Sequence, residues 1–286
     1  SIQRVFVAGA GLMGHGVGQV HAAIGMEVTL YEPELARAQA GRDRIAGNLD
    51  RAVAKGKLDQ GARDEILGRV TATSDLEAVR DADIVIEAVF EDVKVKQELW
   101  REIDSRAPAG AIFASNTSSI SIDQLASAVS PARRQRFVGM HFFSPVPVMP
   151  LVELIRGEAT TDATESAIRE LTDALGKQLI VSADKPGFIV NRILMPLLAE
   201  AMRTLEEGTG TADDIDTGAK VGLNHPMGPL ELADFIGLDV CLNVMKVIHE
   251  GIGGEHFRPP KVLEDLVAAG HLGQKTGRGF HTYPRA

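Results

Sequence analysis

The chain has 286 residues, of which 44% are hydrophobic and 24% are charged, a composition typical of folded globular proteins rather than of disordered or low-complexity chains. Its 39 acidic residues outnumber the 30 lysines and arginines and give a net charge of -9, which argues against a protein that coats nucleic acid. The length exceeds the roughly 100–200 residues of most single domains, so we expect two domains.

Cysteine content and apolar runs bear on compartment and partners. A single cysteine, Cys241, cannot form an internal disulfide, and no cluster of Cys and His has zinc-site spacing, so we expect a reducing compartment and no metal. The apolar stretch 188–202 is interrupted by polar residues and falls short of the about 20 residues that cross a bilayer. The strand-like run at 4–8 follows no basic and apolar leader, so we expect no secretory signal. We therefore expect a cytoplasmic protein with no membrane or nucleic-acid partner.

Short runs of β-branched residues alternate with segments of helical period through the first two thirds of the chain. This alternation is typical of βαβ units and predicts an α/β fold, a Rossmann-like doubly wound parallel sheet. We expect helices at 34–55, 93–103 and 164–175. The predicted strands are 4–8, 27–31, 70–73, 83–88, 111–115, 137–141, 151–155 and 178–181.

After the Asp-Lys-Pro-Gly sequence at 184–187, only helical periodicity remains. Thr211 and Asp214 have the spacing of a capping box, and Pro229 suits a first helical turn. We place the boundary near Pro186, which gives a sheet domain over 1–186 and a smaller all-α domain over 187–286. The predicted helices are 189–207, 212–221, 229–235, 238–249 and 261–269, with a loop at 251–260.

A glycine-rich turn, 9–14, directly follows the first predicted strand and opens a segment of helical period. In that setting Gly9 permits a tight turn, Gly11 lets the backbone approach a pyrophosphate, and Gly14 allows close packing of helix on strand. The helix N-terminus presents unpaired N–H groups to the phosphates. Glu32 ends the second predicted strand, where a carboxylate binds a ribose 2'-hydroxyl and repels a 2'-phosphate.

This arrangement predicts that the first domain binds NAD, with NADP disfavoured. The alternative is a plain strand-to-helix turn with Glu32 as a solvated strand end. The residues assigned to the cofactor are Gly9, Gly11, Leu12, Met13, Gly14 and Glu32.

Oxidation of an alcohol with NAD requires a base, and a histidine that titrates near neutrality is suited to this role. His141 ends the predicted strand 137–141, at the carboxyl edge where open α/β sheets bind ligands. Glu153 lies on the next predicted strand, beyond the turn 145–147, so the chain can fold back to bring its carboxylate to the imidazole. Such a carboxylate fixes the tautomer and stabilises the imidazolium. From these residues alone, a structural histidine and an edge carboxylate remain the alternative.

Several motifs in order along the chain resemble those of the 3-hydroxyacyl-CoA dehydrogenases, and the bacterial 3-hydroxybutyryl-CoA dehydrogenases are especially similar. The resemblance covers nearly the whole chain, from the first strand to the Lys-Thr-Gly-Arg-Gly-Phe sequence at 275–280. The motifs are Gly-Ala-Gly-Leu-Met-Gly at 9–14, Ser-Asn-Thr-Ser-Ser at 115–119, His-Phe-Phe at 141–143, Pro-Val-Pro-Val-Met at 145–149, Leu-Val-Glu at 151–153, Pro-Gly-Phe-Ile-Val-Asn-Arg at 186–192 and His-Pro-Met-Gly-Pro at 225–229.

The resemblance implies His141 as the base, Glu153 as its orienting partner, and Ser118 and Asn191 as catalytic polar groups near the reacting oxygens of the substrate. Taken alone, Ser118 would be a turn or capping serine and Asn191 a helix-surface amide. It also implies that Glu91, Lys96, Asn116 and Lys275 lie around the cofactor, and that the C-terminal helices close the substrate cleft and form a homodimer.

Two further lysines and two departures from the family pattern concern the acyl-CoA. Lys55 and Lys57 could meet the phosphates of coenzyme A, although two exposed lysines usually mark a solvated helix end. Ser144 replaces the Asn usual after His-Phe-Phe, and Pro150 replaces a frequent Lys. Ser144 keeps a hydroxyl in the substrate site but has a shorter reach and no amide.

The sequence thus predicts an NAD-dependent oxidoreductase that interconverts an L-(S)-3-hydroxyacyl-CoA, short in acyl chain, and the 3-ketoacyl-CoA. One alternative is a dehydrogenase of a free 3-hydroxy acid or sugar acid, of the gulonate type. The other is a dinucleotide-binding protein without catalysis.

Overall fold

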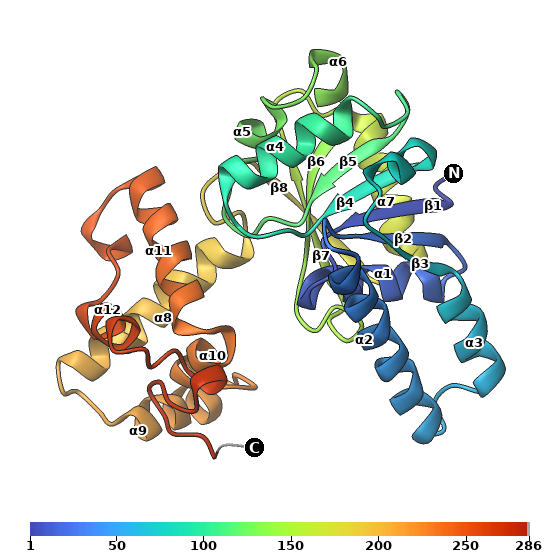
Figure 1. Ribbon diagram of the computed structural model, residues 1–286. Helices are drawn as coiled ribbons and strands as arrows, with labels where there is room; N and C mark the ends of the chain where they lie inside the picture. The colour runs from blue at the N-terminus through green and yellow to red at the C-terminus, as the bar shows by residue number, and fades with distance from the viewer. Residues whose placement is uncertain (285–286) are drawn as a thin grey trace. The chain divides into compact units, whose positions relative to one another are not determined.

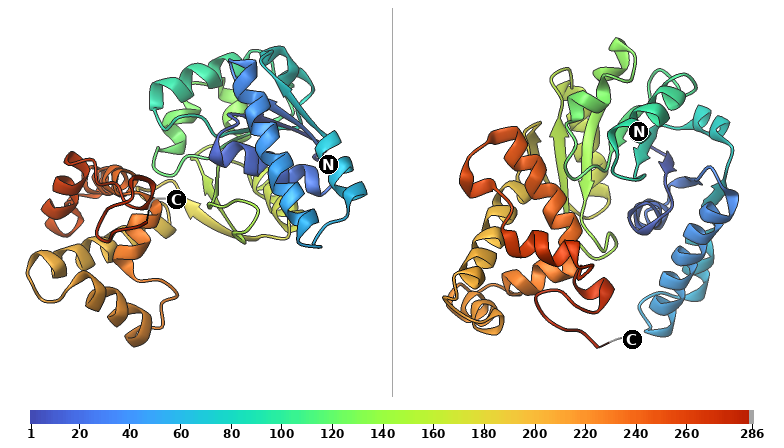
Figure 2. Two further views of the ribbon diagram at one scale, coloured as in Figure 1. Left: turned by 60° about the horizontal axis from the view of Figure 1, so that its bottom comes forward. Right: turned by 60° about the vertical axis from the view of Figure 1, so that its left-hand side comes forward.

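The computed structural model describes residues 1–284 and divides the chain into two compact units, Ser1–Lys185 and Pro186–Ala286 (Figure 1). The division falls one residue before the boundary expected from the sequence. The first unit contains a sheet with helices on both faces, and the second consists of helices and their connections (Figures 1 and 2). The predicted class, a Rossmann-like sheet domain followed by an all-α domain, is confirmed.

The first unit is built on an eight-stranded sheet with the order β3-β2-β1-β4-β5-β6-β7-β8. The order reverses at β1, which pairs with both β2 and β4 in parallel. Such a switch point opens a crevice at the carboxyl ends of the strands, where ligands bind. The strands are β1 (Arg4–Ala8), β2 (Glu27–Tyr31), β3 (Val70–Thr73), β4 (Ile84–Glu87), β5 (Ile112–Ser115), β6 (Phe137–Phe142), β7 (Leu151–Arg156) and β8 (Gln178–Ala183).

One strand pair departs from the all-parallel sheet that the sequence pattern predicts. β7 runs antiparallel to β6, whereas every other neighbouring pair is parallel. Only the segment 143–150 connects β6 to β7. A parallel crossover needs about a dozen residues or more, so this short connection returns the chain in the opposite direction.

Both faces of the sheet are buried, which explains the near-continuous apolar runs in its strands. Val5 and Val7 belong to a core cluster on one face, together with apolar residues of the neighbouring helices. On the other face the Trp100 ring stacks on Phe113, with 4.8 Å between the ring centroids, and contacts Phe137 edge-on, with 5.0 Å between the centroids. The helices are α1 (Leu12–Ala23), α2 (Leu35–Ala54), α3 (Gln60–Gly68), α4 (Val93–Asp104), α5 (Ile122–Ala126), α6 (Pro131–Arg134) and α7 (Asp162–Ala174).

Three of these helices, α3, α5 and α6, are absent from the sequence prediction. They are short, and their apolar periodicity is too brief to stand out. The starts of α3 and α5 nevertheless carry cap signals: the Asp59 carboxylate accepts the N–H of Ala62, and the Ser121 hydroxyl accepts the N–H of Gln124.

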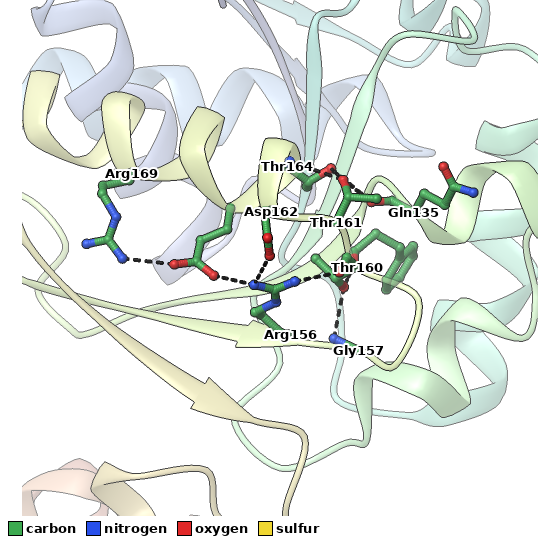
Figure 3. A network of polar contacts seen from close by, with 10 residues as sticks. Gln135, Arg156, Gly157, Thr160, Thr161, Asp162, Thr164 and Arg169 are labelled. Atoms are coloured by element: carbon green, nitrogen blue, oxygen red, sulfur yellow. Dashed lines mark hydrogen bonds and ion pairs between the residues drawn. The ribbon is translucent and has the colours of Figure 1, made fainter.

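Hydrogen bonds and ion pairs connect the C-terminal end of β7 to the start of α7 (Figure 3). The Arg156 guanidinium donates to Asp162 at 2.8 Å, to Glu165 at 2.6 Å and to the Thr160 carbonyl at 2.7 Å. Arg169 and Arg156 hold the pKa of Glu165 below its usual range. Because the Thr160 hydroxyl also donates to the Phe137 carbonyl at 2.8 Å, the network connects β7 to the start of β6.

The second unit contains only helices and connections within the described residues, as predicted. Of the predicted capping box, the bond from the Asp214 N–H to the Thr211 hydroxyl is confirmed, and Pro229 occupies the first turn of its helix as predicted. The expected loop 251–260 begins later, because the preceding helix continues to Ile252. The elements are α8 (Val190–Glu206), α9 (Ala212–Thr217), η2 (Gly218–Gly222), α10 (Pro229–Ile236), α11 (Leu238–Ile252), η3 (Glu255–Phe257), α12 (Lys261–Ala268) and η4 (Gln274–Thr276).

His21, on the buried side of α1, makes the first unit sensitive to acid. Its Nδ1–H donates to the Val17 carbonyl at 2.7 Å, while Nε2 is buried with no hydrogen-bond partner among residues 1–284. Burial lowers the pKa of His21 from 6.5 to about 4. The unfolded chain therefore takes up a proton below pH 6.5 that the folded chain accepts only near pH 4, and stability is lost as the pH falls through this window.

We expect the substitution His21→Phe to remove this loss. Between about pH 7 and about pH 4.5, the free energy of unfolding should fall by about 2–3 kcal/mol more in the wild type than in the variant, because only the wild type carries the shifted group. Urea denaturation at both pH values measures the difference. The exposed His256, replaced by Phe, is the matched control and should follow the wild type. Equal losses in the His21 variant and the wild type would contradict the assignment.

Candidate active site

The glycine-rich turn lies between β1 and α1 and is closely packed on one side and open on the other. Gly9 has a φ of +102°, and an added Cβ would lie 2.6 Å from the Ala88 carbonyl oxygen. At Gly14 an added Cβ would collide with the Gly9 carbonyl. At Gly11, by contrast, an added Cβ would meet no atom within 4 Å. The turn thus leaves room in front of Gly11 while the chain on either side packs tightly.

The first turn of α1 directly follows the glycine-rich turn, and its backbone N–H groups have no side-chain cap. Gly11 is the N-cap and has no side chain to satisfy them. Leu12 is exposed and Met13 is half-buried at the start of the helix. Because the N-terminus of a helix carries partial positive charge, this arrangement can hold a phosphate.

Glu32 follows β2 and lies beside the same turn. Its Oε1 accepts the N–H of Ala10 at 2.9 Å. The side chain is half-buried. The carboxylate therefore has one oxygen fixed on the glycine-rich turn, and this bond holds it at the carboxyl edge of β1 and β2, where a ribose hydroxyl of a bound dinucleotide is expected.

His141 and Glu153 face each other across the antiparallel pair. They are directly opposite in the register of β6 and β7, so their side chains share one face of the sheet. His141 Nδ1 donates to Glu153 Oε1 at 3.0 Å. His141 is 8% exposed and Glu153 is 0% exposed. With Nδ1 protonated, a neutral imidazole carries its lone pair on Nε2, the atom that can take a proton.

The loop after β5 carries two of the predicted residues and is bonded to both neighbouring segments. The Asn116 side-chain oxygen accepts the N–H of Phe142 at 2.8 Å, which fixes this loop beside the end of β6. Glu91 accepts the N–H of Ser118 at 2.9 Å and its hydroxyl at 3.1 Å. The structure therefore brings Asn116, Ser118 and Glu91 together at the carboxyl edge.

Lys96 is more deeply placed than the sequence suggests. It is 1% exposed and lies 2.5 Å from Glu87 Oε2 and 3.5 Å from Glu91 Oε1. Sequence reasoning missed Glu87, which is 0% exposed. A carboxylate at the end of the apolar strand Ile-Val-Ile-Glu is the pattern that could have found it.

The remaining predicted residues lie elsewhere. Lys55 and Lys57 are exposed just beyond the C-terminal end of α2. Ser144 is exposed in the loop 143–150, whose carbonyls at Val146 and Met149 each accept a hydrogen bond from Lys177 at 2.6 Å.

Two predicted residues belong to the second unit. Asn191 is in the first turn of α8. Lys275, in η4, donates to Asp239 at 2.6 Å. Lys275 is therefore anchored to the start of α11.

Residues 1–284 contain neither a metal-binding cluster nor a membrane-spanning helix. This part of the chain has no group of three or more His, Cys, Asp or Glu side chains that could hold a metal ion. None of its helices combines the length and apolar character needed to span a bilayer.

Two family models match consecutive parts of the chain. The 3-hydroxyacyl-CoA dehydrogenase NAD binding domain matches residues 4–185, and the 3-hydroxyacyl-CoA dehydrogenase C-terminal domain matches residues 187–283. A 3-hydroxybutyryl-CoA dehydrogenase of Bradyrhizobium diazoefficiens is 49% identical, over 99% of this chain and 96% of that protein. One of Mycobacterium tuberculosis is 46% identical, over 99% of both. The crystal structure of (S)-3-hydroxybutyryl-CoA dehydrogenase PaaH1 from Ralstonia eutropha has a TM-score of 0.96 and 44% identity, with 100% of both chains covered.

Proposed function

The chain belongs to the 3-hydroxyacyl-CoA dehydrogenase family, and on that basis we propose that it interconverts L-(S)-3-hydroxyacyl-CoA and 3-ketoacyl-CoA with NAD, using His141 and Glu153 as its acid–base pair. The observation that carries this proposal is the 3.0 Å contact between His141 Nδ1 and Glu153 Oε1 at the carboxyl edge of the sheet. Relatives named for 3-hydroxybutyryl-CoA support a short acyl chain.

The chemistry divides between the cofactor and the chain. NAD, when bound, supplies the acceptor for the hydride that leaves C3 of the substrate. His141 Nε2 takes the proton of the C3 hydroxyl, and the Glu153 carboxylate stabilises the imidazolium that forms. In the reverse direction the imidazolium returns the proton to the oxygen of the ketone. Positioned acid–base groups contribute about 10²–10⁴-fold to such steps.

The turn 9–14 and the N-terminus of α1 form the binding site for the pyrophosphate of the cofactor. The open side of Gly11 and the uncapped helix N-terminus suit a pyrophosphate. Glu32 selects NAD over NADP through the ribose hydroxyl. Around the rest of the cofactor we place Glu91, Lys96, Asn116 and Lys275, with Lys96 acting through its contact with Glu91.

The remaining assignments concern the substrate. Ser118 and Asn191 stabilise charge on the reacting oxygen, and Ser144 contributes a short hydroxyl where an amide is usual. Lys55 and Lys57 meet the phosphates of coenzyme A. We further propose that residues 1–186 bind NAD, that helices of 187–286 form a homodimer, and that the protein acts in the cytoplasm.

The decisive assay is acetoacetyl-CoA-dependent oxidation of NADH by the purified chain. We expect turnover that is fastest with short acyl chains in a length series. Turnover of free hydroxy acids or sugar acids in place of acyl-CoA would favour the gulonate-type alternative. NADH binding without turnover of either class would favour a non-catalytic dinucleotide-binding protein.

For Glu32→Gln we expect a change in cofactor preference. The amide oxygen can still accept the N–H of Ala10, so the turn should keep its shape. The variant loses the negative charge that repels a 2'-phosphate, and the ratio of kcat/KM for NADH to that for NADPH should fall about 10-fold. Glu34→Gln, at an exposed position on the same loop, is the matched control. An unchanged ratio in the Glu32 variant would count against the ribose assignment.

A further inference from the structure

A fully buried carboxylate lies where β4 and β5 end. Glu87, the last residue of β4, is 0% exposed and belongs to none of the motifs that define the proposed site. Its Oε1 accepts a hydrogen bond from the Ser115 hydroxyl at 2.7 Å, and its Oε2 accepts one from Lys96 Nζ at 2.5 Å. Glu87 therefore connects the end of β5 to α4.

One arm of this contact network runs through Lys96 to Glu91. Lys96 Nζ donates to the Val89 carbonyl at 3.2 Å and lies 3.5 Å from Glu91 Oε1. Glu87 also accepts the N–H of Val89 at 3.0 Å. Both backbone groups of Val89 are thus held, and the segment that leads to Glu91 has a fixed path.

The second arm runs along the backbone from Ser115 and meets the first at Ser118. Glu91 accepts the hydroxyl of Thr117 at 2.7 Å, the N–H of Ser118 at 2.9 Å and the hydroxyl of Ser118 at 3.1 Å. The contacts therefore form a closed ring from Glu87 through Lys96 and Glu91 to Ser118, and back along the chain to Ser115.

Stability alone does not account for a buried ion pair of this kind. Removing two charges from water costs several kcal/mol per ion, and well-packed apolar residues of similar volume are often as stabilising or more so. The pair does, however, fix geometry, because each of its polar atoms has a bonded partner in one arrangement.

We propose that Glu87 is a positioning residue, which holds the Ser118 hydroxyl in the place required for the reaction through Lys96 and Glu91 on one side and Ser115 on the other. The inference rests on the proposed function, which puts Ser118 beside the reacting oxygen. Preorganised polar groups act in the transition state only if they are already in place. A displacement of about 1 Å can lower the rate about 10²-fold.

A double-mutant cycle tests this coupling. Glu87→Gln keeps the size of the side chain but removes its negative charge. The Lys96 ammonium should then shift toward the Glu91 carboxylate and compete with the N–H and hydroxyl of Ser118 for its oxygens. We expect kcat for acetoacetyl-CoA reduction to fall about 10-fold or more in the wild-type background, but less than about twofold in the Ser118→Ala background. Equal losses in the two backgrounds, or no loss in the first, would overturn the proposal.

Two further variants separate positioning from folding. Glu102→Gln removes an exposed carboxylate from α4, the helix that carries Lys96, and should leave kcat unchanged. Ser115→Ala removes a single hydroxyl and no charge, so it tests the second arm even if Glu87→Gln fails to fold. Its loss should be smaller than that of Glu87→Gln and should also disappear in the Ser118→Ala background. Persistence of that loss contradicts the proposed path.

Amide hydrogen exchange distinguishes failure of this inference from failure of the proposed function. A wild type that does not turn over acetoacetyl-CoA refutes the function. Independently of turnover, Glu87→Gln should accelerate exchange of the Ser118 amide about 10-fold, because its acceptor Glu91 is less firmly held. If that variant does not fold, Ser115→Ala should have the same effect, because the backbone that leads from Ser115 to Ser118 is less firmly held. Unchanged exchange overturns the positioning role whether or not the enzyme is active.

Discussion

Replacing His141 with Gln should lower kcat about 10²–10⁴-fold while leaving the affinity for NADH within about twofold of the wild type. Glutamine fills a similar volume and can still contact Glu153, but it cannot take a proton near neutral pH. His141 lies on β6, whereas the glycine-rich turn lies between β1 and α1. Loss of the proposed base should therefore affect the chemical step and not cofactor binding. Steady-state turnover of acetoacetyl-CoA and fluorescence titration with NADH measure the two effects.

The exposed His256, replaced with Gln, is the control and should behave as the wild type. The pH profile adds a second criterion. Any activity that remains in the His141 variant should lose the part of the pH dependence that comes from protonation of the proposed base, because that base has been removed. Near-normal turnover in the variant would remove His141 from its role as base.

Glu153→Gln should give the second large loss, of about 10²–10⁴-fold in kcat, for a different reason. Glu153 is an obligate acceptor for His141 Nδ1–H. A glutamine amide can instead donate to Nδ1, which moves the imidazole proton to Nε2 and leaves the base in the wrong tautomer. Even with the amide oxygen facing His141, the negative charge that stabilises the imidazolium is lost. Turnover and its pH dependence, measured together, distinguish this effect from unfolding.

Glu158→Gln provides the matched control, because Glu158 is an exposed carboxylate shortly after the end of β7. It should keep wild-type kcat. A Glu153 variant that folds, binds NADH and turns over at the wild-type rate would show that the carboxylate does not act on the imidazole.

The parts of the molecule that could be predicted from the sequence are those encoded within short segments. The turn 9–14 requires glycine at Gly9 and Gly14 for steric reasons that leave a spaced pattern in the sequence. The contact between His141 and Glu153 could be expected because each residue ends or lies on an apolar run and a short turn separates the two runs. Local spacing predicts the geometry in both cases, whereas the roles of these residues come from the family resemblance.

Other features depend on contacts between distant segments and could not be predicted in this way. Glu87 is one residue in an apolar strand, and only the fold brings Ser115 and Lys96 to it. The depth of Lys96 is likewise a tertiary property, since a helical lysine is ordinarily exposed. The helix α3 follows α2 after a break of a few residues, and its two buried positions, Ile66 and Leu67, give little periodicity.

The reversed direction of β7 also determines how much sequence change the proposed acid–base pair can tolerate. His141 and Glu153 lie opposite one another because β6 and β7 pair without a bulge, from Val138 opposite Arg156 to Phe142 opposite Val152. Side chains alternate between faces, so slippage by a single position would send the carboxylate to the far side of the sheet. Lengthening the connection 143–150 would not do so, provided the ladder stays aligned and Lys177 keeps its bonds to the Val146 and Met149 carbonyls. A change in the length of that connection therefore leaves the dyad aligned, whereas an inserted or deleted residue within either strand would abolish it.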